Sequence, residues 1–179
     1  KAAVKLDRDT AVALDSRTGV PVTSAVQGVQ TTSESNDFGV SVGRSGVTYV
    51  ADPTAPLYAT PTGRITDRVY TFHFSPALVA GADLWRPIWW DAHGIPDKLN
   101  YVASRKDFAR VRATYGSDLP STVGLRGVFG SFPGSSGGLV PLRSTTLPLQ
   151  RTEYFWAGKD VTWSNTLYYQ EIQPVYRYE

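Results

Sequence analysis

Side chains that could bind a metal ion are few in this chain of 179 residues, which contains two histidines, His73 and His93, and no cysteine. A zinc site needs at least three convergent ligands, and the local candidates are only Asp91 and His93, two residues apart. An Asp-x-His pair in a turn is more often a hydrogen-bonded loop. A calcium site built from carboxylates and backbone carbonyls stays open, although the spacing of an EF-hand loop is absent. We therefore assign no metal ligand and no cofactor.

A serine nucleophile is the next chemistry to consider. The segment 134–138, GSSGG, resembles the Gly-Asp-Ser-Gly-Gly loop of trypsin-like proteases, with Ser136 in the nucleophile position and Ser135 in place of the acidic residue. Acyl transfer also needs a histidine base. Trypsin-like proteases have a β-barrel between the histidine and the serine in the chain, and the segment between His93 and Ser136 is too short to form one. We therefore interpret the segment as a glycine-serine loop, and a trypsin-like hydrolase is a remote alternative.

Trp85, Trp89 and Trp90 form the densest aromatic cluster and are the candidate surface-binding residues, because exposed tryptophans could stack on sugar rings. On a strand, the adjacent Trp89 and Trp90 should point to opposite faces, so only one of them can line a given surface. Tryptophan is highly buried on average, and Pro87 indicates an edge position. A core role for most of the cluster is therefore the competing interpretation.

The elements that would position these residues are predicted to be strands. Short segments rich in Val, Thr, Tyr, Phe and Trp are separated by glycine and proline, which is typical of an all-β fold. Alternation is clear at 68–74, where Tyr70, Phe72 and Phe74 share one face. We expect an antiparallel β-sandwich, with one core or two packed subregions. The expected strands are 10–14, 20–30, 38–42, 47–50, 68–74, 85–90, 99–103, 122–129, 152–156 and 166–172.

One segment, SRKDFARVRATYG at 104–116, favours a helix instead. Ser104 is a suitable N-cap with Asp107 three residues later, and a glycine ends the segment. Phe108, Val111 and Tyr115 recur at the spacing of one helical stripe. The sequence therefore predicts a short helix near residues 105–115 that covers an edge or an open end of the sandwich.

Composition limits the classes of partner. The chain has 18 basic and 16 acidic residues, and the basic residues are dispersed, which argues against nucleic acid. No segment approaches the roughly 18 consecutive apolar residues that a membrane span needs, and the first residues lack the apolar segment of a signal peptide. Without cysteine, the redox compartment is undetermined. The absence of methionine suggests a processed or excised segment.

We treat residues 1–179 as a single β-rich domain, or part of one, with a candidate sub-boundary at the turn-rich residues 91–98.

Three blocks of the sequence together resemble the region that follows the catalytic domain in secreted actinobacterial proteases of the subtilisin family. They are AVALDSRTGVPV at 11–22, the segment 104–116, and LPLQRTEYFWAGKDVTW at 147–163. In that family the blocks correspond to a strand pair, a helix that ends in Tyr-Gly, and an Arg-Thr-Glu-Tyr strand followed by a Val-x-Trp strand. The triad motifs of the family are absent, because Asp15 is followed by Ser-Arg, His93 by Gly-Ile, and there is no methionine for Gly-Thr-Ser-Met-Ala.

The resemblance implies a non-catalytic accessory β-sandwich domain of a secreted, extracellular, subtilisin-like serine protease. Such a domain would act in positioning, in stability, or in engagement of substrate or the cell surface. Its partners would be its own protease domain in the parent chain and a polymeric protein or cell-wall substrate, with neither nucleic acid nor membrane involved. No catalytic residue is assigned in this segment. The alternative is a carbohydrate- or surface-binding module.

Overall fold

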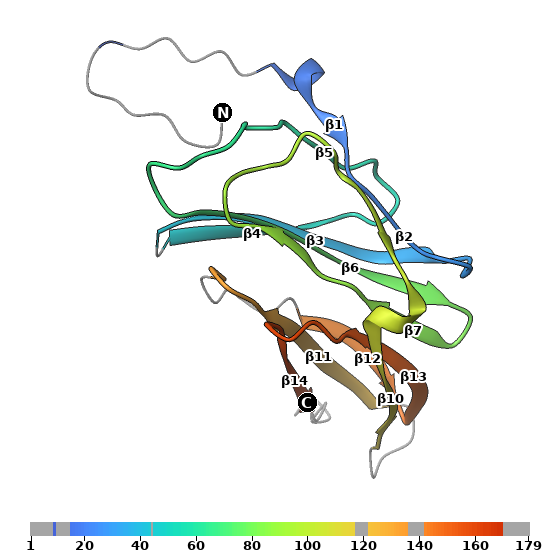
Figure 1. The fold of residues 1–179 in the computed structure, drawn as a ribbon. Coiled ribbons are helices and arrows are strands. Elements are labelled where there is room, and N and C mark those ends of the chain that lie inside the picture. The colour runs from blue at the N-terminus through green and yellow to red at the C-terminus, as the bar shows by residue number, and fades with distance from the viewer. Residues whose placement is uncertain (1–8, 10–14, 44, 117–121, 136–141, 170–179) are drawn as a thin grey trace, which may run out of the picture.

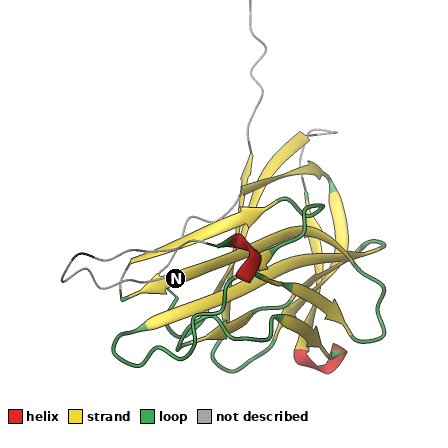
Figure 2. Ribbon diagram, turned by 90° about the horizontal axis from the view of Figure 1, so that it is seen from above, coloured by secondary structure: helices red, strands yellow, loops and turns green. Residues whose placement is uncertain are grey.

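The computed structural model describes residue 9 and residues 15–43, 45–116, 122–135 and 142–169. Strands dominate this part of the chain, and its two helical segments are 3-10 turns, η1 (Ser16–Thr18) and η2 (Arg105–Asp107). Figure 2 shows these turns as the short red segments among the strands. Within the described residues no helix is long and apolar enough to cross a membrane. The predicted all-β fold is confirmed.

The strands are β1 (Val20–Pro21), β2 (Thr23–Val26), β3 (Thr32–Val42), β4 (Ser45–Ala51), β5 (Tyr58–Ala59), β6 (Tyr70–Ala80), β7 (Asp83–Arg86), β8 (Trp89–Asp91), β9 (Asn100–Ala103), β10 (Phe108–Tyr115), β11 (Thr122–Ser131), β12 (Leu142–Leu147), β13 (Leu149–Trp156) and β14 (Thr162–Tyr169).

A seven-stranded sheet organises the molecule, with the order β10-β13-β7-β6-β3-β4 and with β8 also paired to β6. Its pairs are antiparallel except for β13 with β7, which run parallel. A three-stranded sheet has the order β12-β11-β14, and β1-β5 and β2-β9 form two-stranded sheets. In Figure 1, β3, β4 and β6 cross the middle of the molecule, while β10 to β14 gather below them.

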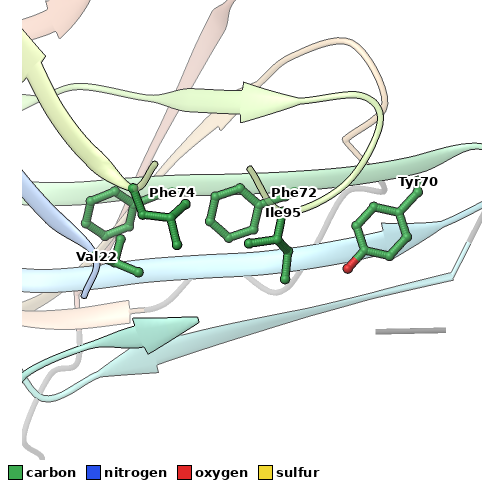
Figure 3. Close-up of a cluster of buried hydrophobic side chains, with 6 residues drawn as sticks. Val22, Tyr70, Phe72, Phe74 and Ile95 are labelled. Carbon is green, nitrogen blue, oxygen red and sulfur yellow. The ribbon is translucent and has the colours of Figure 1, made fainter. Parts of the chain in front are cut away.

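One face of the seven-stranded sheet is apolar. Tyr70, Phe72 and Phe74 of β6 point to it, as the alternation predicts, and all three are at most 1% exposed. Val22 and Ile95 pack on them from outside the sheet, as Figure 3 shows. We call this side the apolar face. Its core forms because β6 places alternate aromatic rings on one side.

The opposite face, which we call the polar face, is also buried. It carries Asp37 of β3, His73 of β6, Arg86 of β7 and Glu153 of β13, and the last three are each at most 8% exposed. The three-stranded sheet covers it, because Arg126 of β11 contacts Glu153. Further contacts join Arg143 of β12 to Asp37 and Phe132 to His73. The two sheets therefore form a sandwich whose interface contains charges.

The predicted helix near residues 105–115 is wrong. The start signal is present, because Asp107 Oδ2 accepts the Ser104 N–H at 2.8 Å, but it produces only the 3-10 turn η2. From Phe108 the chain is extended and pairs with β13 over its whole length. The same residues also alternate, so that Ala113 and Tyr115 are buried on one face. Pairing with a distant strand outweighs a helical propensity that is marginal for so short a segment.

Other boundaries also differ from the prediction. The expected strand 20–30 is divided into β1 and β2, and 85–90 into β7 and β8 with Pro87 in the gap. Strands β5 and β12 were not predicted. The expected strand 10–14 and the end of the strand 166–172 lie outside the described residues.

Candidate binding site

Trp85 is not a surface residue, so its assignment as a surface-binding candidate is wrong. It is 4% exposed and its ring is stacked on Tyr154 with a centroid distance of 3.7 Å and an interplanar angle of 4°. Phe108 contacts it edge-on. The residue points to the apolar face of β7, where Val26 and Leu78 complete a buried cluster.

Trp89 and Trp90 lie on opposite faces of the sheet, as predicted. Trp89 pairs with Phe74 in the register of β6 and β8, and its ring is stacked on Phe74 at 6.0 Å and on Tyr101 at 4.9 Å. Trp90 pairs with His73 and is stacked on Phe132 at 5.6 Å. Both tryptophans are half-buried, so each presents part of its ring to solvent.

A groove lies at this end of the sheet and encloses about 370 Å³. We call it the aromatic groove. Trp156 of β13 joins Trp89 there, with ring centroids 6.0 Å apart and an interplanar angle of 59°. The groove is lined by Ile88, Trp89, Trp90, Asp91, Pro96, Lys98, Tyr101 and Trp156. Both adjacent tryptophans therefore border it, and the expectation that only one could line a given surface is wrong.

Polar groups stand among these rings. Burial, with a smaller contribution from the negative charge of Asp91, raises the pKa of Tyr101 to about 12. Its hydroxyl therefore stays protonated at neutral pH and can donate and accept hydrogen bonds. Lys98 adds three N–H donors and Asp91 adds a carboxylate. The groove thus combines flat apolar surfaces with a few polar groups, which is the usual composition of a ligand site.

The Asp91-x-His93 pair is a hydrogen-bonded turn, because Asp91 Oδ1 accepts the backbone N–H of His93 at 2.7 Å. The described part of the chain contains no group of three or more His, Cys, Asp or Glu that could hold a metal ion. His93 itself is exposed. The structure therefore gives this pair the role of a turn.

The described structure does not test the hydrolase alternative, because it includes only the two histidines. Ser136 lies outside the described residues. His73 is 8% exposed, and burial lowers its pKa to about 4. His93 is exposed in the turn after β8, so the two histidines occupy different environments. The Ser136 alternative stays an untested prediction.

A buried charge cluster on the polar face was missed from the sequence. Glu153 Oε2 accepts a hydrogen bond from Arg126 Nη2 at 2.6 Å, and Oε1 accepts one from Arg151 Nε at 2.6 Å. The Tyr115 hydroxyl donates to the same Oε1 at 3.1 Å. Asn165 Oδ1 accepts from Arg126 Nε at 3.0 Å. Glu153 is 1% and Arg126 4% exposed, so the two form a buried ion pair. Such a pair is stable only when its members are well hydrogen-bonded.

The motif residues of the third sequence block have packing roles here. Arg151 and Glu153 belong to the buried charge cluster, and Tyr154 is stacked on Trp85. Trp163 donates its indole N–H to the Trp156 carbonyl at 2.9 Å. These contacts give the block a structural role in the sandwich. Its one contribution to the candidate site is Trp156.

Comparisons with known proteins identify no relative: no family model, no curated protein and no solved structure matches this chain.

Proposed function

We propose that this chain is a non-catalytic β-sandwich module that binds a carbohydrate polymer in the aromatic groove. The observation that carries the proposal is the convergence of Trp89, Tyr101 and Trp156 in one open groove with polar groups beside them. A sugar ring presents an apolar face to an aromatic ring and hydroxyl groups at its edge. The groove offers a partner for each.

The rings are held in place before any ligand binds. Trp89 is stacked on both Phe74 and Tyr101, which also contact each other, and Trp156 is fixed edge-on against Phe108. Side chains that are ordered in the free protein lose little further conformational entropy on binding. The groove volume of about 370 Å³ lies at the small end of the roughly 300–1,000 Å³ that is usual for ligand sites, which suits one or two sugar rings of a longer chain.

The setting that we propose is an accessory domain of a secreted subtilisin-like serine protease. Support comes from the three-block sequence resemblance and from the packing roles of Arg151, Glu153 and Tyr154. In that setting the module would hold the protease near a cell-wall or other polymeric substrate. The helix that the resemblance implies at 105–115 is absent, so the support rests on the sequence blocks rather than on that element.

Carbohydrate binding is tested by titrating intrinsic tryptophan fluorescence with soluble fragments of cellulose, chitin and peptidoglycan. We expect saturable quenching with at least one of them. Trp156→Ala should weaken that binding at least tenfold, which corresponds to about 1.4 kcal/mol. Tyr101→Phe keeps the ring and tests the hydroxyl alone. Tyr168→Ala is the matched control, because Tyr168 is an aromatic residue of β14 that is 55% exposed and does not line the groove.

The absence of a saturable response to all three polymers would remove the support for carbohydrate binding. The protease setting is tested separately. The reading frame that encodes this chain should contain the subtilisin triad upstream, and the chain alone should hydrolyse neither casein nor a peptide ester. A reading frame without a subtilisin-like domain would exclude the protease setting. Carbohydrate binding in the aromatic groove would still be decided by the fluorescence titration.

A further inference from the structure

Among the described residues, the strand β4 is an edge of the seven-stranded sheet with no strand on its outer side. Among the described strands it pairs only with β3, and the register is regular from Ser45 to Ala51. An edge strand presents unpaired N–H and C=O groups, and proteins normally block such an edge with charged residues, proline or a bulge. The sequence of β4, SGVTYVA, has none of these. The opposite edge, β10, carries Arg110 and Arg112.

The side chains of β4 leave apolar surface exposed next to this free backbone. Val47 is 50% exposed, Tyr49 56% and Val50 48%. Tyr49 is stacked on Phe38 of β3 with a centroid distance of 5.4 Å. Because Phe38 packs against the core of the apolar face, Val47 and Tyr49 continue that face beyond the residues that cover it. A strand added at this edge would cover both.

We propose that a second copy of this chain pairs with β4, with the two strands antiparallel and centred on Thr48. A two-fold interface must be complementary to itself, and β4 meets that condition. Centring on Thr48 places Val47 opposite the Tyr49 of the second copy, and Thr48 opposite Thr48. Aromatic with β-branched pairs and Thr with Thr pairs are favourable across antiparallel strands. No charge in the strand opposes a like charge.

This pairing would join two seven-stranded sheets into one continuous sheet. A pair of seven-residue strands buries less than the roughly 1,200–2,000 Å² of a standard stable interface. We therefore expect a weak and reversible dimer with a dissociation constant on the order of 100 μM. The inference is independent of the proposed carbohydrate binding, because β4 contributes no residue to the aromatic groove.

Sedimentation velocity of the whole chain over a concentration range that brackets this dissociation constant tests the association. We expect the dimer fraction of the native sequence to rise with concentration. Val47→Lys, which adds a charge to the edge, should be monomeric throughout. Val111→Lys is the matched control on β10, where Val111 is 42% exposed, and it should associate as the native chain does. A native chain that stays monomeric, or a Val47→Lys variant that dimerises equally well, would overturn the proposal.

A disulfide tests the register. The chain has no cysteine, so Thr48→Cys introduces a single thiol at the two-fold axis. Residues directly opposed in antiparallel strands have Cα atoms about 4.5–5.5 Å apart, within the range of about 4.4–6.8 Å that a disulfide accepts. Under mild oxidation Thr48→Cys should give a covalent dimer well before Val111→Cys does. Equal rates of disulfide formation in the two variants would place the contact between copies elsewhere. If the chain stays monomeric and its β4 amide signals shift only when an unrelated extended peptide is added, the edge binds a foreign strand. Either result would refute self-pairing.

Discussion

Replacing Asp37 with asparagine should stabilise the protein above pH 6. The Asp37 side chain is 14% exposed on the polar face, and the nearest cation, Arg143 Nη2, is 3.7 Å from its Oδ1. That oxygen has no hydrogen-bond partner in the described structure. Burial raises the pKa of Asp37 to about 6, because the positive charges of Arg143 and Arg86 offset only part of the cost of a buried carboxylate.

The expected gain follows from the difference between the folded and unfolded pKa values. The pKa of Asp37 rises from 3.8 to about 6 on folding, and each pKa unit corresponds to about 1.4 kcal/mol, so the charged form costs about 3 kcal/mol. The folded state holds this proton more tightly than the unfolded state does. The stabilising contribution is therefore complete below about pH 4 and is lost as the pH rises to about 6. Asparagine stays neutral and avoids the loss.

His73 lines the same small cavity as Asp37. Its titration has the opposite effect on the pH dependence of stability. Burial lowers its pKa from 6.5 to about 4, so the folded state binds this proton less tightly than the unfolded state. Its contribution is complete above about pH 6.5 and is lost as the pH falls to about 4. Between about pH 4 and 6, the titration of Asp37 lowers the free energy of unfolding with rising pH, whereas the titration of His73 raises it. The native chain should therefore show little pH dependence of stability in that window.

Urea unfolding between pH 4 and pH 8 separates the two groups. In Asp37→Asn, the free energy of unfolding should rise with pH from about 4 to 6.5, because of these two groups only His73 remains. In His73→Phe it should fall between about pH 4 and 6, and the double variant should be flat. Asp15→Asn, at an exposed ion pair with Arg17, controls for the loss of a surface carboxylate. Unfolding free energies of Asp37→Asn that parallel those of the native chain at every pH would refute this reasoning.

Three further substitutions test the packing, each by urea unfolding at pH 7. Glu153→Ala leaves the buried Arg126 without its carboxylate and should cost about 3–5 kcal/mol, so a loss below 1 kcal/mol would count against the buried charge cluster. Gly39→Ala should cost about 1–3 kcal/mol, because an added Cβ would collide with the Val47 carbonyl oxygen and lie 2.6 Å from His73 Cε1. Gly116→Ala, whose added Cβ would have no other atom within 4 Å, is its control and should show no comparable loss. Trp85→Ala should cost about 3–5 kcal/mol, and an unchanged unfolding midpoint would contradict its burial.

The fold class could be predicted because alternation is a local signal. In β6, Tyr70, Phe72 and Phe74 occupy alternate positions, and a strand with that pattern must place them on one face. The opposite face was harder to interpret. Thr71 and His73 alternate with the aromatic residues on the other side of the strand, and both are buried as well. No local pattern shows that a second sheet covers a polar face.

The helix prediction failed because the segment 104–116 satisfies two periodicities. Phe108, Val111 and Tyr115 fit a helical stripe, whereas Ala113 and Tyr115 are alternate residues that a strand buries together. Only the partner decides between these patterns, and that partner is β13, far along the chain. Long-range pairing is invisible in a reading of the segment alone.

The candidate site was predicted only in part for the same reason. Trp89 and Trp90 were recognised from their density in the sequence, and their opposite orientations follow from adjacency. By strand alternation Trp156 shares a face with Tyr154, but nothing local indicates that this face meets Trp89. The parallel pairing of β13 with β7 brings Trp156 there. Tyr101 arrives from β9, which pairs with β2.

The buried charge cluster and the aromatic groove are connected through β13. Glu153 points to the polar face, while Trp156, three residues later, contacts Trp89 at the groove. A strand that slipped by one residue would move Glu153 away from Arg126 and exchange the faces of all its side chains. Because a buried charge without its partner is costly, the ion pair opposes any such slip. We therefore expect Glu153→Ala to weaken ligand binding in the groove as well as stability, although no atom of Glu153 lines it, whereas Asp15→Asn should change neither.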